Sequence, residues 1–173
     1  MKVIAFGASN SKNSINKQLA AYTLSLVEGA EGEVLDLNDY DLPLFSEDKE
    51  KEIGQPKPAQ DFLDKIAGSD ALIISFAEHN GSYSAAYKNL FDWCSRIDPK
   101  VYQGKSLVLL ATSPGPSGAS SVLAAATNSA PYFNGEVKGS VSVPKFYDNF
   151  DVESGRISNA DIEQKLRDAV KKL

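Results

Sequence analysis

Apolar runs and helical repeats alternate along the chain. Short apolar and β-branched runs are typical of strands buried in a sheet. The pattern predicts five such strands: Lys2–Phe6, Glu33–Leu37, Ala71–Phe76, Lys105–Ala111 and Val137–Val143. We expect Ala71–Phe76, which is apolar almost throughout, at the centre of the sheet.

Between these strands, apolar residues recur every three or four positions, which is the spacing of one face of an α-helix. The first such set runs from Ile15 to Leu26. Further sets predict helices over Gln60–Gly68, about Ala86–Ile97, Ser121–Ser129 and Ile162–Leu173. Ser158, followed by Asp161 three residues later, resembles a capping box for the last helix.

Two segments carry neither pattern. Asn38–Pro58 is polar, contains three prolines and includes the charged stretch SEDKEKE, which predicts a surface or covering loop. Phe146–Ile157 precedes the last helix and shows no clear core pattern. We therefore expect Asn38–Pro58 to lie outside the regular elements.

The alternation of strands and helices predicts the fold class. It is typical of a parallel sheet with helices on both faces, connected by right-handed crossovers. With 173 residues and 42% hydrophobic content, the chain is long enough for one domain with a substantial core. We expect a single α/β domain over 1–173, a flavodoxin-like, doubly wound, five-stranded parallel sheet.

Charge and composition narrow the function. The net charge of −5 and the lack of a dense basic run argue against nucleic acid as a partner. No apolar run approaches the roughly 18 residues of a membrane helix, so we expect no membrane partner and a cytoplasmic location. Cys94 is the only cysteine and is interpreted as a packing thiol on a helix. His79 is the only histidine, which argues against a His-rich metal site.

Three polar loops follow the first, third and fourth strands: GASNSKNSIN (7–16), AEHNGSYS (77–84) and TSPGPSGA (112–119). Ligands of open parallel sheets bind beyond the carboxyl ends of the strands, where these loops converge. Any one loop taken alone is also explained by ordinary turn residues. Three loops rich in Ser, Asn and Gly on one edge favour a ligand site.

The first loop leads into a helix N-terminus, where free N–H groups and the helix dipole favour anions. Ser9, Ser11 and Ser14 offer hydroxyls, Asn16 offers an amide, and Lys12 adds charge. Ser14 also fits a simple N-cap. Neither a P-loop nor the dinucleotide glycine motif is present, which favours a mononucleotide phosphate.

The other two loops suit a planar ligand. His79 directly follows the central strand and is either a solvated loop residue or a partner for a flat ring. Asn80 and the backbone of Gly81 would then bond the polar rim of that ring. The glycines and prolines of Thr112–Gly118 allow a close and rigid backbone approach.

Motifs in and after these three loops resemble those of a known family. Residues 8–16, ASNSKNSIN, are similar to G-S-x-R-x-x-S-x-N, and residues 77–84, followed by YKNLFDW (87–93), are similar to P-E-Y-N-x-S-x-P and L-K-N-A-I-D-W. Residues 113–118 match S-x-G-x-x-G. Over about residues 1–145 the chain resembles the NAD(P)H-dependent FMN reductases, the flavodoxin-like group that includes quinone, azo-dye and chromate reductases.

This resemblance implies an oxidoreductase with one FMN per subunit. Hydride would pass from NADPH or NADH to the flavin and then to a small-molecule electron acceptor: a quinone, an azo compound, a metal ion or free flavin. A homodimer or homotetramer is implied, and no protein acid or base. The implied cofactor-binding residues are Ser9, Ser11, Ser14, Ile15, Asn16, Glu78, His79, Asn80, Gly81, Ser82, Ser113, Gly115 and Gly118.

The sequence also departs from the family motifs. Ser11 stands at the arginine position, His79 at the tyrosine, and Ala77 and Ser84 at the two prolines. Lys12 is a candidate to replace the missing arginine charge. Two other functions stay open: a flavodoxin-like electron carrier without NAD(P)H turnover, and a binding protein without flavin.

Overall fold

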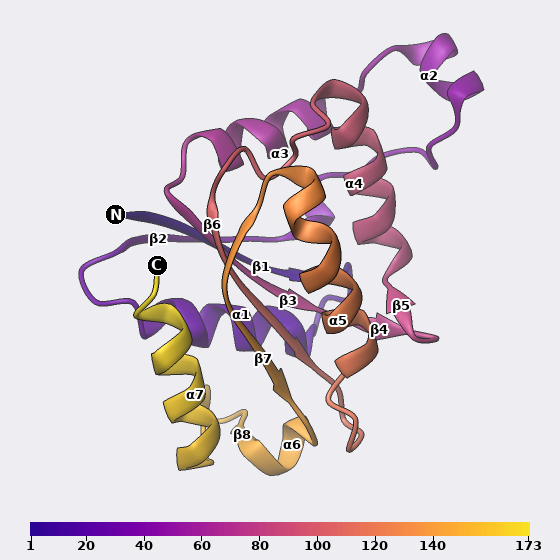
Figure 1. Cartoon of the computed structure of the whole chain (residues 1–173). Helices are drawn as coiled ribbons and strands as arrows, with labels where there is room; N and C mark the ends of the chain where they lie inside the picture. Colours follow the sequence, from indigo (N-terminus) through magenta and orange to yellow (C-terminus); the bar gives the residue numbers. More distant parts are fainter.

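A five-stranded parallel sheet forms the centre of the molecule in a computed structural model that describes residues 1–173 (Figure 1). Its strands are β1 (Lys2–Ala8), β2 (Glu31–Leu35), β3 (Ala71–Phe76), β6 (Ser106–Thr112) and β7 (Glu136–Val143). Their order is β2-β1-β3-β6-β7, and all pairs are parallel. The five predicted strands are confirmed, although β2 begins and ends two residues earlier than expected.

Helices cover both faces of the sheet, as predicted. On one face lie α3 (Lys57–Ala67), α4 (Ala85–Ile97) and α5 (Ser120–Ser129), and on the other α1 (Ile15–Ser25) and α7 (Ala160–Val170). Successive strand residues point to opposite faces, so each strand contributes side chains to two apolar layers. Ile4 and Phe6 belong to the first layer, whereas Val3 and Ala5 belong to the second. Two buried layers explain why the central strands are apolar at nearly every position.

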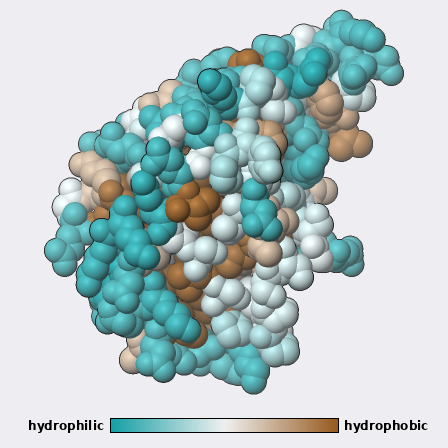
Figure 2. Space-filling view, in the orientation of Figure 1, coloured by the Kyte–Doolittle hydropathy of each residue, from teal (hydrophilic) through white to brown (hydrophobic).

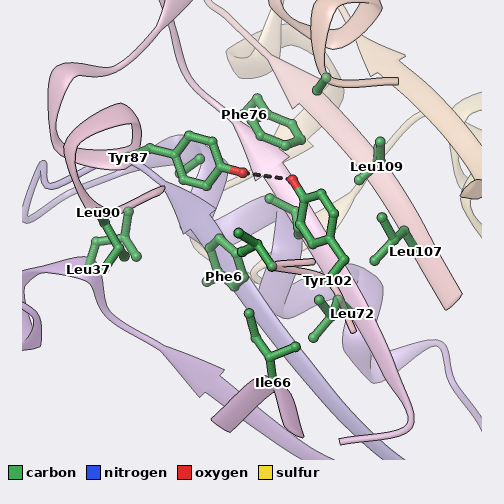
Figure 3. Packing of buried hydrophobic residues seen from close by; sticks show 14 of the residues in the cluster. Phe6, Leu37, Ile66, Leu72, Phe76, Tyr87, Leu90, Tyr102, Leu107 and Leu109 are labelled. Atoms are coloured by element: carbon green, nitrogen blue, oxygen red, sulfur yellow. Dashed lines mark hydrogen bonds between the residues drawn. The ribbon is translucent and has the colours of Figure 1, made fainter. Parts of the chain in front are cut away.

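The layer under α4 is rich in aromatic rings (Figure 3). Phe76 packs edge-on against Tyr87, with ring centroids 5.3 Å apart. The hydroxyls of Tyr87 and Tyr102 are 2.9 Å apart, so each buried hydroxyl has a partner. Burial is the main cause that raises the pKa of both phenols. Cys94 has no exposed surface, which confirms its role as a packing thiol.

Gly7 lets α1 approach β1 closely. A Cβ at this position would lie 2.4 Å from the backbone nitrogen of Lys17 and 2.9 Å from the carbonyl carbon of Asn16. No side chain fits there without moving the helix. The first turn of α1 therefore sits directly against the end of β1, which fixes the position of the first loop.

The segment Asn38–Pro58 is not the simple loop that we expected. It contains a 3-10 helix η1 (Leu37–Asp39) and α2 (Glu47–Ile53), and its last residues begin α3. In Figure 1, α2 lies on an arm that projects from the body. The arm is held by α4: the indole N–H of Trp93 donates to the Pro43 carbonyl at 2.8 Å, and Arg96 pairs with Glu50. Ser46 caps α2, so the charged stretch is a solvated helix.

The segment Phe146–Ile157 is also ordered, and its two phenylalanines belong to the core. It forms α6 (Phe146–Asn149) and the hairpin β8 (Phe150–Asp151) with β9 (Arg156–Ile157). Phe146 and Phe150 stack with centroids 4.6 Å apart, and both are buried. The sequence shows no clear core pattern here because three buried residues scattered over twelve positions follow no single period.

The predicted cap of the last helix is wrong by one residue. The Asn159 side chain, not Ser158, accepts the N–H groups of Asp161 and Ile162. A 3-10 helix η2 (Ala130–Phe133) follows α5 and was not predicted. No helix of the protein is both long enough and apolar enough to span a bilayer.

Candidate functional site

The three polar loops meet at the carboxyl ends of β1, β3 and β6, as predicted from the alternating pattern. They enclose a hollow of about 250 Å³. It is lined by Ser9, Ser11, Asn13, Ser14, Ile15, Asn16, Ala77, Glu78, His79, Thr112, Ser113, Pro114 and Tyr147. The strand order places this hollow where β1 adjoins β3 and the winding direction reverses, the usual ligand position in a doubly wound sheet.

The first loop is held by its own hydroxyls. Ser14 caps α1, because its Oγ accepts the Lys17 N–H at 3.1 Å. The Oγ of Ser9 accepts the Ser11 N–H at 3.1 Å. Ser9 and Ser14 are both buried, while Ser11 is exposed. The N-cap interpretation of Ser14 is thus confirmed, and Ser9 supports the loop in a similar way.

Several backbone donors of the first loop have no acceptor within the protein. The N–H groups of Asn10, Lys12, Asn13, Ile15 and Asn16 make no hydrogen bond, whereas those of Ser9, Ser11 and Ser14 do. Consecutive unpaired N–H groups at a helix N-terminus form an anion-binding nest. This arrangement fits a phosphate group.

Asn16 lies beside the hollow, but its side chain is bonded inside the protein. Its Oδ1 accepts the hydroxyl of Ser75 at 2.7 Å and the N–H of Thr112 at 3.1 Å. Its Nδ2 donates to the Thr112 carbonyl at 3.2 Å. Asn16 is only 3% exposed. It therefore ties α1 to β3 and β6, and its backbone N–H makes no hydrogen bond within the protein.

The second loop is a β-hairpin rather than an irregular loop. β4 (Glu78–His79) and β5 (Ser82–Tyr83) are joined by Asn80 and Gly81, both with positive φ. An Asn-Gly pair is the strongest sequence signal for such a turn and could have predicted it. His79 is exposed and lines the hollow. Asn80, Gly81 and Ser82 form the tip of the hairpin and do not line it, so their contact with a cofactor stays a prediction.

Glu78 connects the second loop to the third. Its Oε2 accepts the Val122 N–H at 2.8 Å, in the first turn of α5. A carboxylate at this position also faces the positive end of the helix dipole. Glu78 thus fixes the start of α5 relative to β3.

Ser84, at a position where the resembling family has proline, has a role of its own. Its Oγ caps α4 by accepting the Tyr87 N–H at 3.3 Å. The same hydroxyl donates to the Ala8 carbonyl at 2.7 Å. The hairpin is therefore fastened to the end of β1 by a buried hydroxyl.

The third loop contributes Thr112, Ser113 and Pro114 to the hollow, but not its glycines. Gly118 has φ 58°, and a Cβ there would lie 2.4 Å from the Ser142 hydroxyl oxygen. It packs the loop against β7. The carbonyl of Gly115 accepts the Lys145 N–H at 2.9 Å. Both glycines shape the loop, and direct cofactor contact by either stays a prediction.

Sequence reasoning missed Tyr147, which reaches the hollow from α6. The predicted set also lacks the lining residues Asn13, Ala77, Thr112 and Pro114, although all four lie in the three loops. The lining contains one carboxylate, that of Glu78, and no lysine or arginine. Lys12 does not line the hollow, and Lys17 is paired with Asp36.

A second hollow adjoins the first loop. It has a volume of about 380 Å³ and includes Asn10 of that loop. Its other walls come from η1 and the chain after it and from the first turns of α4. Nearby, Lys17 and the Asn38 N–H lower the pKa of Asp36 to about 2.

The strand order defines a flavodoxin-like protein, with a nest of unpaired N–H groups at its switch point. The model of the NADPH-dependent FMN reductase family matches residues 1–148. The chain therefore belongs to the NADPH-dependent FMN reductase family. It is an oxidoreductase of that class, with FMN as cofactor and NAD(P)H as co-substrate.

Individual relatives agree with this assignment. An NAD(P)H-dependent FMN reductase of Pseudomonas aeruginosa is 30% identical over 119 residues, which cover 68% of this chain and 63% of the relative. A quinone reductase of Escherichia coli has the same identity and coverage. The solved structure of FerB, a flavoenzyme NAD(P)H:(acceptor) oxidoreductase from Paracoccus denitrificans, has the same fold, with a TM-score of 0.75 at 24% identity, covering 98% of this chain and 93% of that one.

Proposed function

We propose that the protein oxidises NADPH or NADH and passes the electrons to a small-molecule acceptor, with a quinone as the leading candidate. The observation that carries this proposal is the set of unpaired N–H groups around a hollow at the β1/β3 switch point. Such a nest suits the phosphate of one mononucleotide. Family membership makes that mononucleotide FMN.

The first loop would hold the phosphate. The free N–H groups of Ile15 and Asn16 and the hydroxyls of Ser9, Ser11 and Ser14 would donate to its oxygens. Glu78, His79 and Ser113, which line the same hollow, would contact the rest of the cofactor. Bound FMN would supply the redox chemistry between the nicotinamide and the acceptor. The protein binds and orients both partners.

A visible spectrum of the purified protein tests cofactor binding. We expect a yellow protein whose flavin absorbance bleaches on anaerobic addition of NADPH or NADH and returns when a quinone is added. Failure of FMN to co-purify or to bind on titration would refute the proposal. Steady-state oxidation of NAD(P)H with a quinone separates an enzyme from a flavodoxin-like electron carrier, which would show almost no turnover.

We also propose that the protein works as a homodimer or homotetramer. The arm carrying α2 projects from the body, and its apolar side chains include Leu44, which is 80% exposed, and Ile53, which is 45% exposed (Figure 2). Exposed apolar side chains on a projecting segment favour contact with another subunit. Light scattering coupled to size exclusion should give a mass of two or four times 18.6 kDa, and Leu44→Asp should reduce it. A monomeric wild-type protein would contradict this proposal.

The remaining expectation concerns location. We propose the cytoplasm, where NADPH and NADH are available as reductants. Cell fractionation with an antibody against the protein would test it, and recovery in the membrane or secreted fraction would contradict it.

A further inference from the structure

Tyr147 is the one lining residue of the hollow that comes from outside the three loops. It lies in α6, immediately after the end of β7, near the third loop in Figure 1. Two backbone hydrogen bonds tie this corner to the third loop: Lys145 N–H donates to the Gly115 carbonyl at 2.9 Å, and Phe146 N–H to the Ser113 carbonyl at 3.0 Å. The position of Tyr147 relative to the site is therefore set by the fold.

The ring of Tyr147 is also supported from behind. It packs edge-on against Phe146, with centroids 5.3 Å apart and planes at 83°. Phe146 is completely buried and stacks on Phe150. Tyr147 itself is 64% exposed, and its hydroxyl has no partner in the protein. A supported ring with a free hydroxyl is poised to meet a ligand.

The charge of the hollow determines which groups can bind a phosphate there. A phosphate monoester carries between one and two negative charges near neutral pH. The lining contains no lysine or arginine, and it includes the carboxylate of Glu78. Phosphate binding therefore relies mainly on backbone N–H groups and hydroxyls, and a hydroxyl that donates to an ionised oxygen makes a stronger hydrogen bond than one that donates to a neutral oxygen.

We propose that Tyr147 is a phosphate-binding residue of this site, whose hydroxyl donates a hydrogen bond to the phosphate of the bound mononucleotide. It would complete, from α6, the set of donors that the first loop begins. This inference rests on the proposed FMN function, and it names a residue that no motif of the three loops contains.

The test compares FMN with riboflavin, which has the same ring and ribityl chain but no phosphate. Full-length wild-type protein and Tyr147→Phe are titrated with each flavin, following the quenching of flavin fluorescence. We expect Tyr147→Phe to bind FMN about tenfold more weakly, the loss of one hydrogen bond to a charged group, and to bind riboflavin as the wild type does. Tyr132→Phe is the matched control: Tyr132 is 86% exposed and lies on η2, away from the hollow.

A second readout reports on the phosphate directly. The ³¹P resonance of bound FMN should shift in Tyr147→Phe, while the visible spectrum of the flavin stays unchanged. Wild-type affinity for FMN in Tyr147→Phe, or an equal loss for FMN and riboflavin, would overturn the inference. If the wild-type protein does not bind FMN at all, the proposed function fails first, so the two failures are distinguishable.

Discussion

The side chain of Asn16 makes two hydrogen bonds with the backbone of Thr112. Its Oδ1 accepts the Thr112 N–H at 3.1 Å, and its Nδ2 donates to the Thr112 carbonyl at 3.2 Å. These residues are 96 positions apart and belong to the first turn of α1 and the last position of β6. The contact joins the first and third loops beneath the hollow. Because Ser75 donates to the same oxygen, one carboxamide positions three elements.

Replacing Asn16 by alanine should therefore destabilise the protein even without flavin. The change leaves the Thr112 N–H and the Ser75 hydroxyl buried without a partner, each costing about 1–3 kcal/mol. We expect a loss of about 2–4 kcal/mol in the free energy of unfolding, measured by urea denaturation of the flavin-free protein.

Asn13→Ala is the matched control for this measurement. Asn13 lies in the same loop and lines the hollow, but it is exposed and its side chain makes no hydrogen bond in the protein. Its replacement should change stability by less than about 0.5 kcal/mol. Equal stability losses in the two variants would contradict the structural role of Asn16.

The sequence predicted the sheet because its strands are buried on both faces. A continuous apolar run such as Ala71–Phe76 is typical of a strand buried on both faces, and α3 and α4 each have a clear apolar face. The arm with α2 was missed for the opposite reason. Its helix has no buried residue, so no apolar periodicity marks it, and its attachment to Trp93 and Arg96 depends on contacts 46 to 50 residues away.

The sequence predicted where the candidate site lies better than it predicted which side chains line it. The strand order sends the ends of β1, β3 and β6 to one edge, so the loops had to meet. Which side chains face the hollow depends on local hydrogen bonds: Asn16 turns inward, and the hairpin carries Asn80 to an exposed tip. The sequence did not predict Tyr147 as a lining residue, because Phe146–Ile157 has no periodic apolar pattern that would place α6 beside the third loop.

The bond between Glu78 and the start of α5 gives a second prediction. Glu78→Ala removes a charged acceptor from the Val122 N–H and from the helix dipole, which should cost about 1–2 kcal/mol of unfolding free energy. Glu78→Gln keeps an acceptor without the charge and should lose about half as much. Thermal unfolding of the three proteins provides the measurement, and equal losses in both variants would show that the charge contributes nothing.

The pair Lys17–Asp36 predicts a small, pH-dependent contribution. The pKa of Asp36 in the folded protein is about 2, below its ordinary value of 3.8. A carboxyl whose pKa falls on folding stabilises the protein above its unfolded pKa, and this stabilisation disappears as the pH drops through the folded pKa. Both side chains are about one third exposed, at 34% and 31%, so the pair should contribute less than about 1 kcal/mol.

Asp36→Asn should accordingly be less stable than the wild type at neutral pH, with a difference that shrinks as the pH falls from about 4 towards 2. High salt should reduce the difference as well. Lys17→Met and the double variant complete the cycle, which urea unfolding at each pH would measure. A coupling that grows on acidification would contradict the assigned bridge.

The last prediction concerns Cys94. This thiol is fully buried on α4, its Sγ is 3.6 Å from the Ala59 carbonyl oxygen, and burial raises its pKa to about 12. At about pH 8 only about one molecule in ten thousand would carry the reactive thiolate, even if the reagent could enter. Ellman's reagent should therefore leave the native protein unmodified and titrate one thiol in concentrated guanidinium chloride. Cys94→Ala should give no signal in either state and should retain flavin binding. Rapid labelling of the native wild type would show instead that α4 opens readily and exposes the core beneath it.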